Sequence, residues 1–303
     1  EVMVQFQPIT YSNQGPLINR LWITTLEYLN GRLTMERKYY RTLEYFEEFQ
    51  NRGDQTPFFD IALNELKIEP DIISGSLDRI PKQGPLIVVA NHPFGIVDGL
   101  CLASTIHKVR PDLQILANHA LQKAEPMRKW LIPLDDSGTR AAEKNNRPAI
   151  MQAMRYVRDG GCLCIFPAGR VARPAKWGAP VKDYTWQEFA GRMVMSAHRS
   201  KMAAKILPVY FDGKNSSLFQ VAYLLKMMSL RRALVVAEAL KKQNQKIDMH
   251  IGRAISTEEL PHTKDTQTLL NKMREMVFDL QPAPVYFPES YGPKTLTETA
   301  STS

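Results

Sequence analysis

Short apolar runs alternate with amphipathic stretches along the chain from about residue 60 onward. Apolar runs bounded by turn residues predict buried strands at 86–90, 113–116, 162–166, 206–211 and 247–251. The stretches between them have helical spacing, at about 98–108, 119–130, 141–158, 186–200, 217–229 and 266–280. The segment 231–240 fits a helix or a strand equally well. Strands that alternate with helices predict an α/β fold with a mixed, largely parallel central sheet flanked by helices.

Further segments lie on either side of this α/β region. Residues 1–16 are polar and turn-rich, and the apolar positions of 17–33 recur every three or four residues, as on an amphipathic helix. A second helix at about 35–49 completes an N-terminal helical pair, which either docks on the core or rests on lipid headgroups. We therefore divide the chain into an N-terminal arm with amphipathic helices (1–60), an α/β domain (61–281) and an extended or disordered tail (282–303).

Composition and charge restrict the class of protein. The chain has 303 residues, of which 44% are hydrophobic and 23% charged, as in an ordinary folded protein. Its net charge of +8 favours anionic partners, namely nucleic acid, anionic lipid or an acidic carrier protein, or serves only solubility. We see neither a signal-peptide pattern nor a run near the ~20 apolar residues that span a bilayer. A protein that works at a membrane would then lie on its surface.

Cysteine usage indicates a reducing compartment. The odd number of cysteines, Cys101, Cys162 and Cys164, and their apolar neighbours argue against a disulfide framework. Cys162 and Cys164 alternate within an expected strand, so we predict that they share one buried face. No second pair of Cys or His residues has ligand spacing, and we expect no metal site.

The stretch 91–99, Asn-His-Pro-Phe-Gly-Ile-Val-Asp-Gly, carries the clearest chemical signal. It follows strand 86–90 and places His92 and Asp98 in one short segment. A His paired with a carboxylate makes a general base near neutral pH; the alternative is a surface loop in which His92 caps a helix. Six positions along a regular helix would point the two side chains apart. We therefore predict that the turn folds back on itself and that Gly95 allows it.

Two more turns carry cationic or polar side chains. The stretch 166–174, Phe-Pro-Ala-Gly-Arg-Val-Ala-Arg-Pro, follows strand 162–166 and supplies Arg170 and Arg173. If strands 86–90 and 162–166 pair in parallel, these arginines share an edge of the sheet with His92. A guanidinium suits an anion there, because it donates two parallel hydrogen bonds; the alternative is that the arginines pair with surface acids. The turn after strand 206–211 holds Lys214 and Asn215, which either add donors to that edge or form an ordinary polar loop.

In combination, these blocks resemble the phospholipid/glycerol acyltransferase family over about residues 70–256. The resemblance consists of Asn91-His92 with the downstream Asp98, the Phe-Pro-x-Gly turn and the Pro-Val strand. The form Asn-His-Pro-Phe-Gly-x-x-Asp-Gly is similar to the hemolysin-like branch, which includes lyso-ornithine-lipid acyltransferases. Ala168 stands where the common motif has Glu, and Arg170 where it has Thr. These differences imply a headgroup site unlike that of ordinary lysophosphatidate acyltransferases.

The resemblance implies an O-acyltransferase that moves a fatty acyl group from a thioester to the hydroxyl of a lysophospholipid or lyso-aminolipid. Acyl carrier protein or CoA would be the co-substrate, with no bound cofactor and no nucleic acid. The enzyme would be cytoplasmic and peripheral on the inner face of an anionic membrane. The site residues would be the base His92, its orienting partner Asp98, the oxyanion or loop-shaping Gly95 and Gly169, and the acceptor-anion ligands Arg170, Arg173, Lys214 and Asn215.

Two other functions fit the same residues. The His/Asp pair would equally activate water in an acyl thioesterase or hydrolase, although no Gly-x-Ser-x-Gly elbow of a serine hydrolase is present. The positive charge would also suit a non-catalytic protein that binds membranes or nucleic acid, but no zinc finger, RNA-recognition signature or helix-turn-helix stands out. Acceptor-dependent consumption of a thioester distinguishes the transferase from both.

Overall fold

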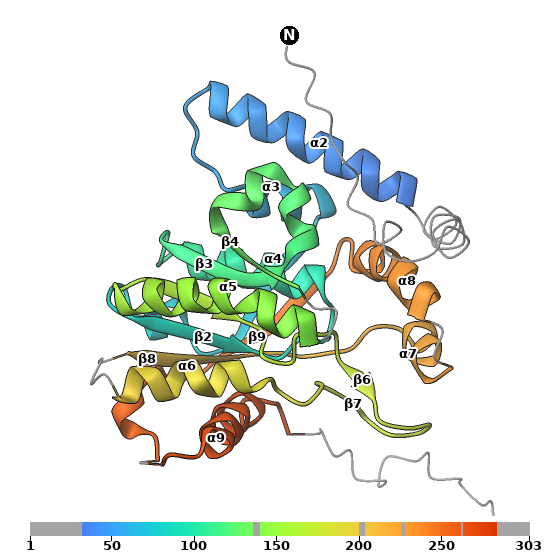
Figure 1. Cartoon of the computed structure of the whole chain (residues 1–303). Helices are drawn as coiled ribbons and strands as arrows, with labels where there is room; N and C mark the ends of the chain where they lie inside the picture. Colours follow the sequence, from blue (N-terminus) through green and yellow to red (C-terminus); the bar gives the residue numbers. More distant parts are fainter. Residues whose placement is uncertain (1–31, 136–139, 200–203, 226–227, 262, 284–303) are drawn as a thin grey trace, which may run out of the picture.

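A computed structural model describes residues 32–135, 140–199, 204–225, 228–261 and 263–283. Almost all of the expected helix at 17–33 and of the expected tail at 282–303 lies outside them. The second expected N-terminal helix is α2 (Arg32–Asn51), which packs against α3 (Phe58–Leu66) at the top of the molecule (Figure 1). None of the described helices is both long enough and apolar enough to cross a bilayer.

The centre of the fold is an eight-stranded sheet. From edge to edge, its strands are β1 (Glu69–Ser74), β9 (Lys246–Ile251), β8 (Lys205–Phe211), β2 (Leu86–Ala90), β5 (Cys162–Ile165), β3 (Leu113–Asn118) and β4 (Leu131–Leu134). The short β10 (Ile255–Ser256) pairs with β8. Pairing is parallel between these neighbours, except that β8 runs antiparallel to both β9 and β10. The predicted mixed, largely parallel sheet is therefore confirmed.

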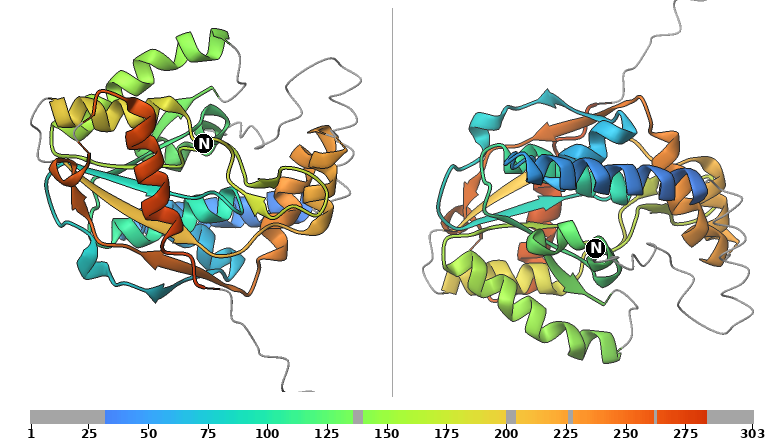
Figure 2. Two further views of the ribbon diagram at one scale, coloured as in Figure 1. Left: turned by 90° about the horizontal axis from the view of Figure 1, so that it is seen from below. Right: turned by 90° about the horizontal axis from the view of Figure 1, so that it is seen from above.

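Helices bury both faces of the sheet. On one face α4 (Ile96–His107), against which α3 packs, shares a core with Val88, Cys162 and Cys164, which confirms that the two cysteines share a face. The alternate side chains, such as Ile87 and Leu163, point to the other face. That face is covered by α5 (Arg140–Arg158), α6 (Glu188–Arg199) and α9 (Thr266–Phe278). Seen from below, α9 lies in front of the sheet, and seen from above α2 does (Figure 2).

The structure corrects several sequence-based expectations. The helix expected at 119–130 is two 3₁₀ segments, η2 (His119–Lys123) and η3 (Glu125–Trp130), because Ala124 leaves helical geometry and Pro126 cannot donate a hydrogen bond. The helix expected at 217–229 is α7 (Ser217–Leu224), followed by α8 (Met228–Lys241), so the undecided segment 231–240 is helical. Short elements without clear periodicity escaped prediction: α3, β1, β4, β10, η1 (Leu77–Arg79) and η4 (Thr257–Glu259).

The sequence pattern also did not predict a two-stranded hairpin. After β5 the chain leaves the sheet and forms β6 (Arg173–Pro174) and β7 (Val181–Lys182), which pair antiparallel. The hairpin projects at the lower right of Figure 1, next to α7, with which β6 is in contact. Its strands of two residues are too short for a pattern of alternation to reveal them.

Arg110 clamps the amino ends of the central strands. Its guanidinium is buried and makes two hydrogen bonds of 2.7 Å to the Asp112 carboxylate. It also donates to the carbonyls of Gly84 at 2.9 Å, Pro81 at 3.3 Å and Gly160 at 2.9 Å. These carbonyls lie in the loops that lead into β2 and β5. One buried side chain thus joins its own loop, which leads into β3, to the loops before β2 and β5, at the edge of the sheet opposite the strands' carboxyl ends.

We expect Arg110→Ala to lower the free energy of unfolding by about 3 kcal/mol, because it leaves buried carbonyls without donors. Urea denaturation measures this change. The matched control is Arg158→Ala, which removes an arginine that is 61% exposed in a surface ion pair. This control should change stability by less than ~0.5 kcal/mol. An equal loss of stability in the two variants would contradict this role of Arg110.

Candidate active site

The three turns singled out in the sequence lie at one edge of the sheet. Strands β5, β2 and β8 are adjacent and parallel, so their carboxyl ends meet there. The parallel pairing of 86–90 with 162–166, which was the condition for His92 and the arginines to share an edge, is present. Ligands in open α/β folds usually bind beyond such ends, which makes this edge the candidate active site.

His92 and Asp98 contact each other across a tight turn. His92 Nδ1 lies 3.1 Å from Asp98 Oδ2, and the same oxygen accepts a hydrogen bond of 3.0 Å from the Phe94 amide. Gly95 has φ +97°, a conformation that favours glycine, and α4 begins at the next residue. The backbone therefore folds back at Gly95, as predicted, and Asp98 points from the first turn of α4 towards His92.

The geometry fixes which imidazole nitrogen can act as a base. Because Nδ1 faces the carboxylate, the neutral ring donates its Nδ1–H to Asp98 and keeps the lone pair on Nε2. The imidazole also lies over Phe166, with ring centroids 4.4 Å apart. Asp98 is fully buried, whereas the His92 side chain is 17% exposed. The pair is thus sheltered from water on the acid side and open on the histidine side.

Two main-chain hydrogen bonds hold His92 in place. Its amide donates to Asp183 Oδ1 at 3.0 Å, and its carbonyl accepts from the Ala172 amide at 2.8 Å. Asp183 is itself positioned by Trp186 Nε1, which donates to Oδ2 at 3.1 Å. Sequence reasoning did not identify Asp183, because an acid between a lysine and a tyrosine resembles any surface loop.

Asn91 joins the ends of two central strands. Its Nδ2 donates to the Phe211 carbonyl at 2.9 Å, and its Oδ1 accepts from the Phe211 amide at 2.7 Å. The amide side chain thus makes the same pair of hydrogen bonds to Phe211 that the backbone of a neighbouring strand would make in a β-sheet. This contact fixes the point at which the His92 turn leaves β2, a role that the sequence motif did not reveal.

The charges around His92 set its basicity. Burial by itself lowers the pKa of the imidazole. The charge of Asp98, its hydrogen bond and the charge of Asp183 together outweigh burial and raise the pKa of His92 above its usual value of 6.5. Burial also raises the pKa of Asp183, against the effect of its hydrogen bonds to His92 and Trp186. His92 is therefore a stronger base than a free histidine and holds its proton to a higher pH.

The two arginines extend from the turn after β5. The Arg173 guanidinium lies between two tyrosine rings, 4.1 Å from the centroid of Tyr184 and 4.4 Å from that of Tyr223. Arg170 is exposed, with its Cζ 5.8 Å from the Tyr184 centroid. Because Ala172 between them binds the His92 carbonyl, both arginines belong to the edge of the sheet that carries His92.

Gly169 and the third turn shape the backbone around the site. Gly169 has φ +63°, and its amide donates to the Phe166 carbonyl at 2.9 Å, so it closes a turn. Asn215 is buried and donates to the Phe94 carbonyl at 3.3 Å, whereas its neighbour Lys214 is exposed. The two candidate anion ligands of this turn therefore differ, because Lys214 faces solvent and Asn215 supports the His92 turn.

Lys242 is a cation that the sequence did not single out. Its ammonium lies 4.4 Å from the centroid of the Phe94 ring, just beyond the carboxyl end of α8. Burial lowers its pKa, although the charges of Glu238 and Asp98 act in the opposite direction. Two consecutive lysines at the end of a helix ordinarily indicate solvent exposure, so the sequence offered no reason to place Lys242 near the site.

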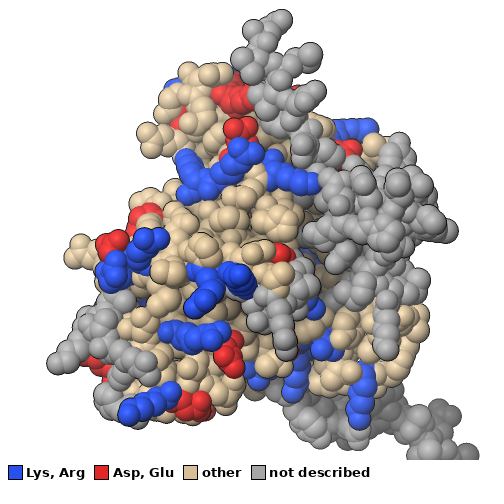
Figure 3. Space-filling model, viewed as in Figure 1, with Lys and Arg blue, Asp and Glu red and all other residues tan. Residues whose placement is uncertain are grey.

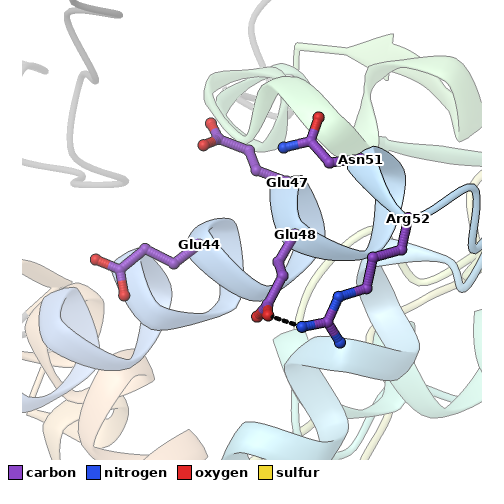
Figure 4. A pocket seen from close by; sticks show the side chains of 5 residues that line it. All are labelled: Glu44, Glu47, Glu48, Asn51 and Arg52. Carbon is purple, nitrogen blue, oxygen red and sulfur yellow. Dashed lines mark hydrogen bonds and ion pairs between the residues drawn. The ribbon is translucent and has the colours of Figure 1, made fainter.

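No group of three or more His, Cys, Asp or Glu side chains within the described residues is arranged to hold a metal ion. An open hollow of about 460 Å³ lies along α2, lined by Glu44, Glu47, Glu48, Asn51 and Arg52 (Figure 4). Glu48 and Arg52 form an ion pair within it. None of the candidate site residues contributes to this hollow, which is a feature of a single helix.

Comparisons with known proteins agree on a family. The sequence model of the family described as Acyltransferase matches residues 68–260. A lyso-glycine lipid O-acyltransferase of Phocaeicola vulgatus is 24% identical over 210 residues, covering 67% of this chain and 71% of that protein. The protein of the same name from Bacteroides thetaiotaomicron is 21% identical over 210 residues, covering 67% and 73%.

Among solved structures, the chain resembles the 1-acyl-sn-glycerophosphate acyltransferase PlsC of Thermotoga maritima. The identity is 17% and the TM-score 0.42, with 86% of this chain and 93% of that chain covered.

The geometry of the pair predicts a pKa that NMR can measure. The His92 imidazole should titrate above pH 6.5, and Asp98→Asn should lower its pKa, because the variant loses the charge and the hydrogen bond of the carboxylate. His107 is an internal control, since burial lowers its pKa and it should titrate below pH 6.5 in both proteins. By linkage, the pair's contribution to stability is complete below pH 6.5 and is lost as the pH rises through the raised pKa. A His92 pKa unchanged in Asp98→Asn would contradict the contact.

Proposed function

The chain belongs to the acyltransferase family, and on that premise we propose that it acylates the free hydroxyl of a lysolipid with a fatty acyl group from a thioester. The observation that carries this proposal is the contact of 3.1 Å between His92 Nδ1 and Asp98 Oδ2 at the carboxyl end of β2. A hydroxyl is a weak nucleophile, and this pair supplies the base that its attack requires. The similarity to two lyso-glycine lipid O-acyltransferases supports a lysolipid as the acceptor.

In the proposed reaction His92 Nε2 removes the proton of the acceptor hydroxyl as its oxygen attacks the thioester carbonyl. Asp98 stabilises the imidazolium that forms. The tetrahedral intermediate then collapses, the carbon–sulfur bond breaks, and the imidazolium returns its proton to the leaving thiolate. One ester and one thiol result, and no side chain of the protein is acylated.

The oxyanion of the intermediate needs hydrogen-bond donors. The Gly169 amide is engaged with Phe166, so we assign the oxyanion to the backbone at Gly95 and the amino end of α4. Amides at a helix amino end carry partial positive charge, and a well-aimed donor lowers such a barrier by about 3 kcal/mol.

The acceptor headgroup would bind to the arginines beside His92. An amino-acid headgroup attached through its nitrogen presents a carboxylate, which suits the two parallel N–H donors of a guanidinium. Stacking between Tyr184 and Tyr223 restricts Arg173, whereas Arg170 is exposed. Lys214 would add charge, and Asn215 would act through its hydrogen bond to Phe94. A lyso-aminolipid is therefore the acceptor class that we favour.

The remaining partners follow from charge. The donor would be an acyl carrier protein or CoA, both anionic and therefore attracted by the net charge of +8. The enzyme would work in the cytoplasm, peripherally on the inner face of an anionic membrane.

Loss of the base or of its partner should slow transfer strongly without unfolding the protein. We expect His92→Ala and Asp98→Asn to slow lysolipid acylation by roughly 10²–10⁴-fold. Release of free thiol from the acyl thioester, measured with and without lysolipid, follows the reaction, and thermal melting checks the fold. Normal turnover in folded His92→Ala would overturn the mechanism. Thiol release that is independent of the acceptor would identify a hydrolase instead.

The arginine beside the base should act on the acceptor. Arg170→Ala is expected to raise the acceptor KM about tenfold with little change in kcat, because it removes a charged contact that ground state and transition state share. Arg158→Ala, on the surface of α5, serves as the control for loss of one positive charge. An unchanged KM in Arg170→Ala would remove this residue from the acceptor site.

A further inference from the structure

Exposed apolar side chains gather on the hairpin and on α7. Trp177, in the turn between β6 and β7, is 63% exposed, and Leu218 and Leu225 of the α7 segment are 51% and 56% exposed. The hairpin and α7 are in contact, and the Arg173 guanidinium joins them by lying between Tyr184 and Tyr223 of α7. We call this the hairpin–α7 surface. A cluster of large apolar side chains that stays exposed to water is typical of a surface that binds a partner.

Positive charge surrounds these apolar side chains. Lys176 and Lys182 of the hairpin are exposed, and so is Lys214 just before α7. The sequence has no Asp or Glu between residues 170 and 182, or between 213 and 225. In the space-filling view, blue side chains lie at the lower right, where Figure 1 places the hairpin, and the described atoms there show no red (Figure 3). The surface is thus complementary to an anionic one.

From these features we propose that the hairpin–α7 surface docks the enzyme on an anionic lipid bilayer, an inference that rests on the proposed lysolipid function. A tryptophan ring flanked by lysines is the combination that settles at the headgroup level of a membrane. Pro174 and Pro180 lack amide hydrogens, and with the lysines they make the hairpin a poor edge for adding a partner's strand. These features favour lipid over a protein partner.

Docking there would bring the base to the membrane. The residue before β6, Ala172, donates to the His92 carbonyl at 2.8 Å, and the residue after β7, Asp183, accepts from the His92 amide at 3.0 Å. The two legs of the hairpin therefore hold the main chain of His92 between them. A hairpin seated in the headgroups presents His92 to hydroxyls at the lipid surface, and the acceptor need not leave the bilayer.

Binding of the full chain to vesicles tests the surface independently of activity. We compare vesicles of phosphatidylcholine alone with vesicles that also contain phosphatidylglycerol. The chain should prefer the anionic vesicles, and Trp177→Ala should weaken binding at least about tenfold, since it removes a large apolar side chain from the interface. Lys176→Glu and Lys182→Glu should each weaken it roughly fivefold or more.

Two matched controls separate docking from general effects. Met151→Ala removes an apolar side chain that is 59% exposed on α5, and Lys108→Glu reverses a charge just after α4, away from the hairpin. Both should bind like the unmodified chain. Trp177→Phe keeps an apolar ring, so it should still bind but lose much of the fluorescence quenching caused by brominated lipids.

Activity assays complete the test. Trp177→Ala should slow acylation of a lysolipid embedded in vesicles but not of a short-chain, monomeric acceptor. Unchanged vesicle binding in Trp177→Ala, or unchanged quenching in Trp177→Phe, would overturn the proposal. So would lysine reversals that raise the KM for an acyl carrier protein and leave vesicle binding intact. If no acyl transfer is detected at all, the vesicle measurements still decide on docking, because they need no catalysis.

Discussion

The contact between His92 and Asp98 is the interaction on which the candidate site depends. It exists only because the backbone reverses at Gly95, where φ is +97°, before α4 begins. One oxygen of Asp98 then serves both the imidazole and the Phe94 amide, which locks the turn and the ring together. A side chain with a Cβ at residue 95 would be strained in that conformation, and its Cβ would lie 3.1 Å from Val171 Cγ2. A single backbone conformation thus determines whether the base is formed.

The remainder of the fold holds this turn from several directions. Asn91 links the start of the turn to the end of β8, and Asn215 donates to Phe94. The residues that flank the hairpin, Ala172 and Asp183, bind the carbonyl and the amide of His92. At the opposite end of the same strands, Arg110 joins the loops that enter the sheet. Rigid support on both ends is what keeps a catalytic group within the narrow geometry that proton transfer needs. The carboxylates of Asp98 and Asp183 add charge, which raises the pKa of His92 despite its burial.

Much of this arrangement was predictable from the sequence, because its signals are local. The apolar runs at 86–90, 162–166 and 206–211 are central strands, and the fold-back at Gly95 follows from helix geometry once His92 is taken to pair with Asp98. The match of residues 68–260 to the acyltransferase family agrees with the resemblance carried by the His92 turn. By contrast, Asp183 and Lys242 reach the site through tertiary packing, and their immediate neighbours in the sequence resemble ordinary surface. Asn215 could be assigned to a turn, but its burial against Phe94 depends on the pairing of β8 with β2.

The claim that His92 is the base and Asp98 sets its basicity is tested most directly by the pH dependence of lysolipid acylation. For the unmodified protein, kcat/KM should rise with pH along one ascending limb whose apparent pKa lies above 6.5, since the neutral imidazole is the active form. In Asp98→Asn the residual activity should follow a limb displaced to lower pH. A limb that keeps its position in that variant, or a rate that does not depend on pH across this range, would contradict the account.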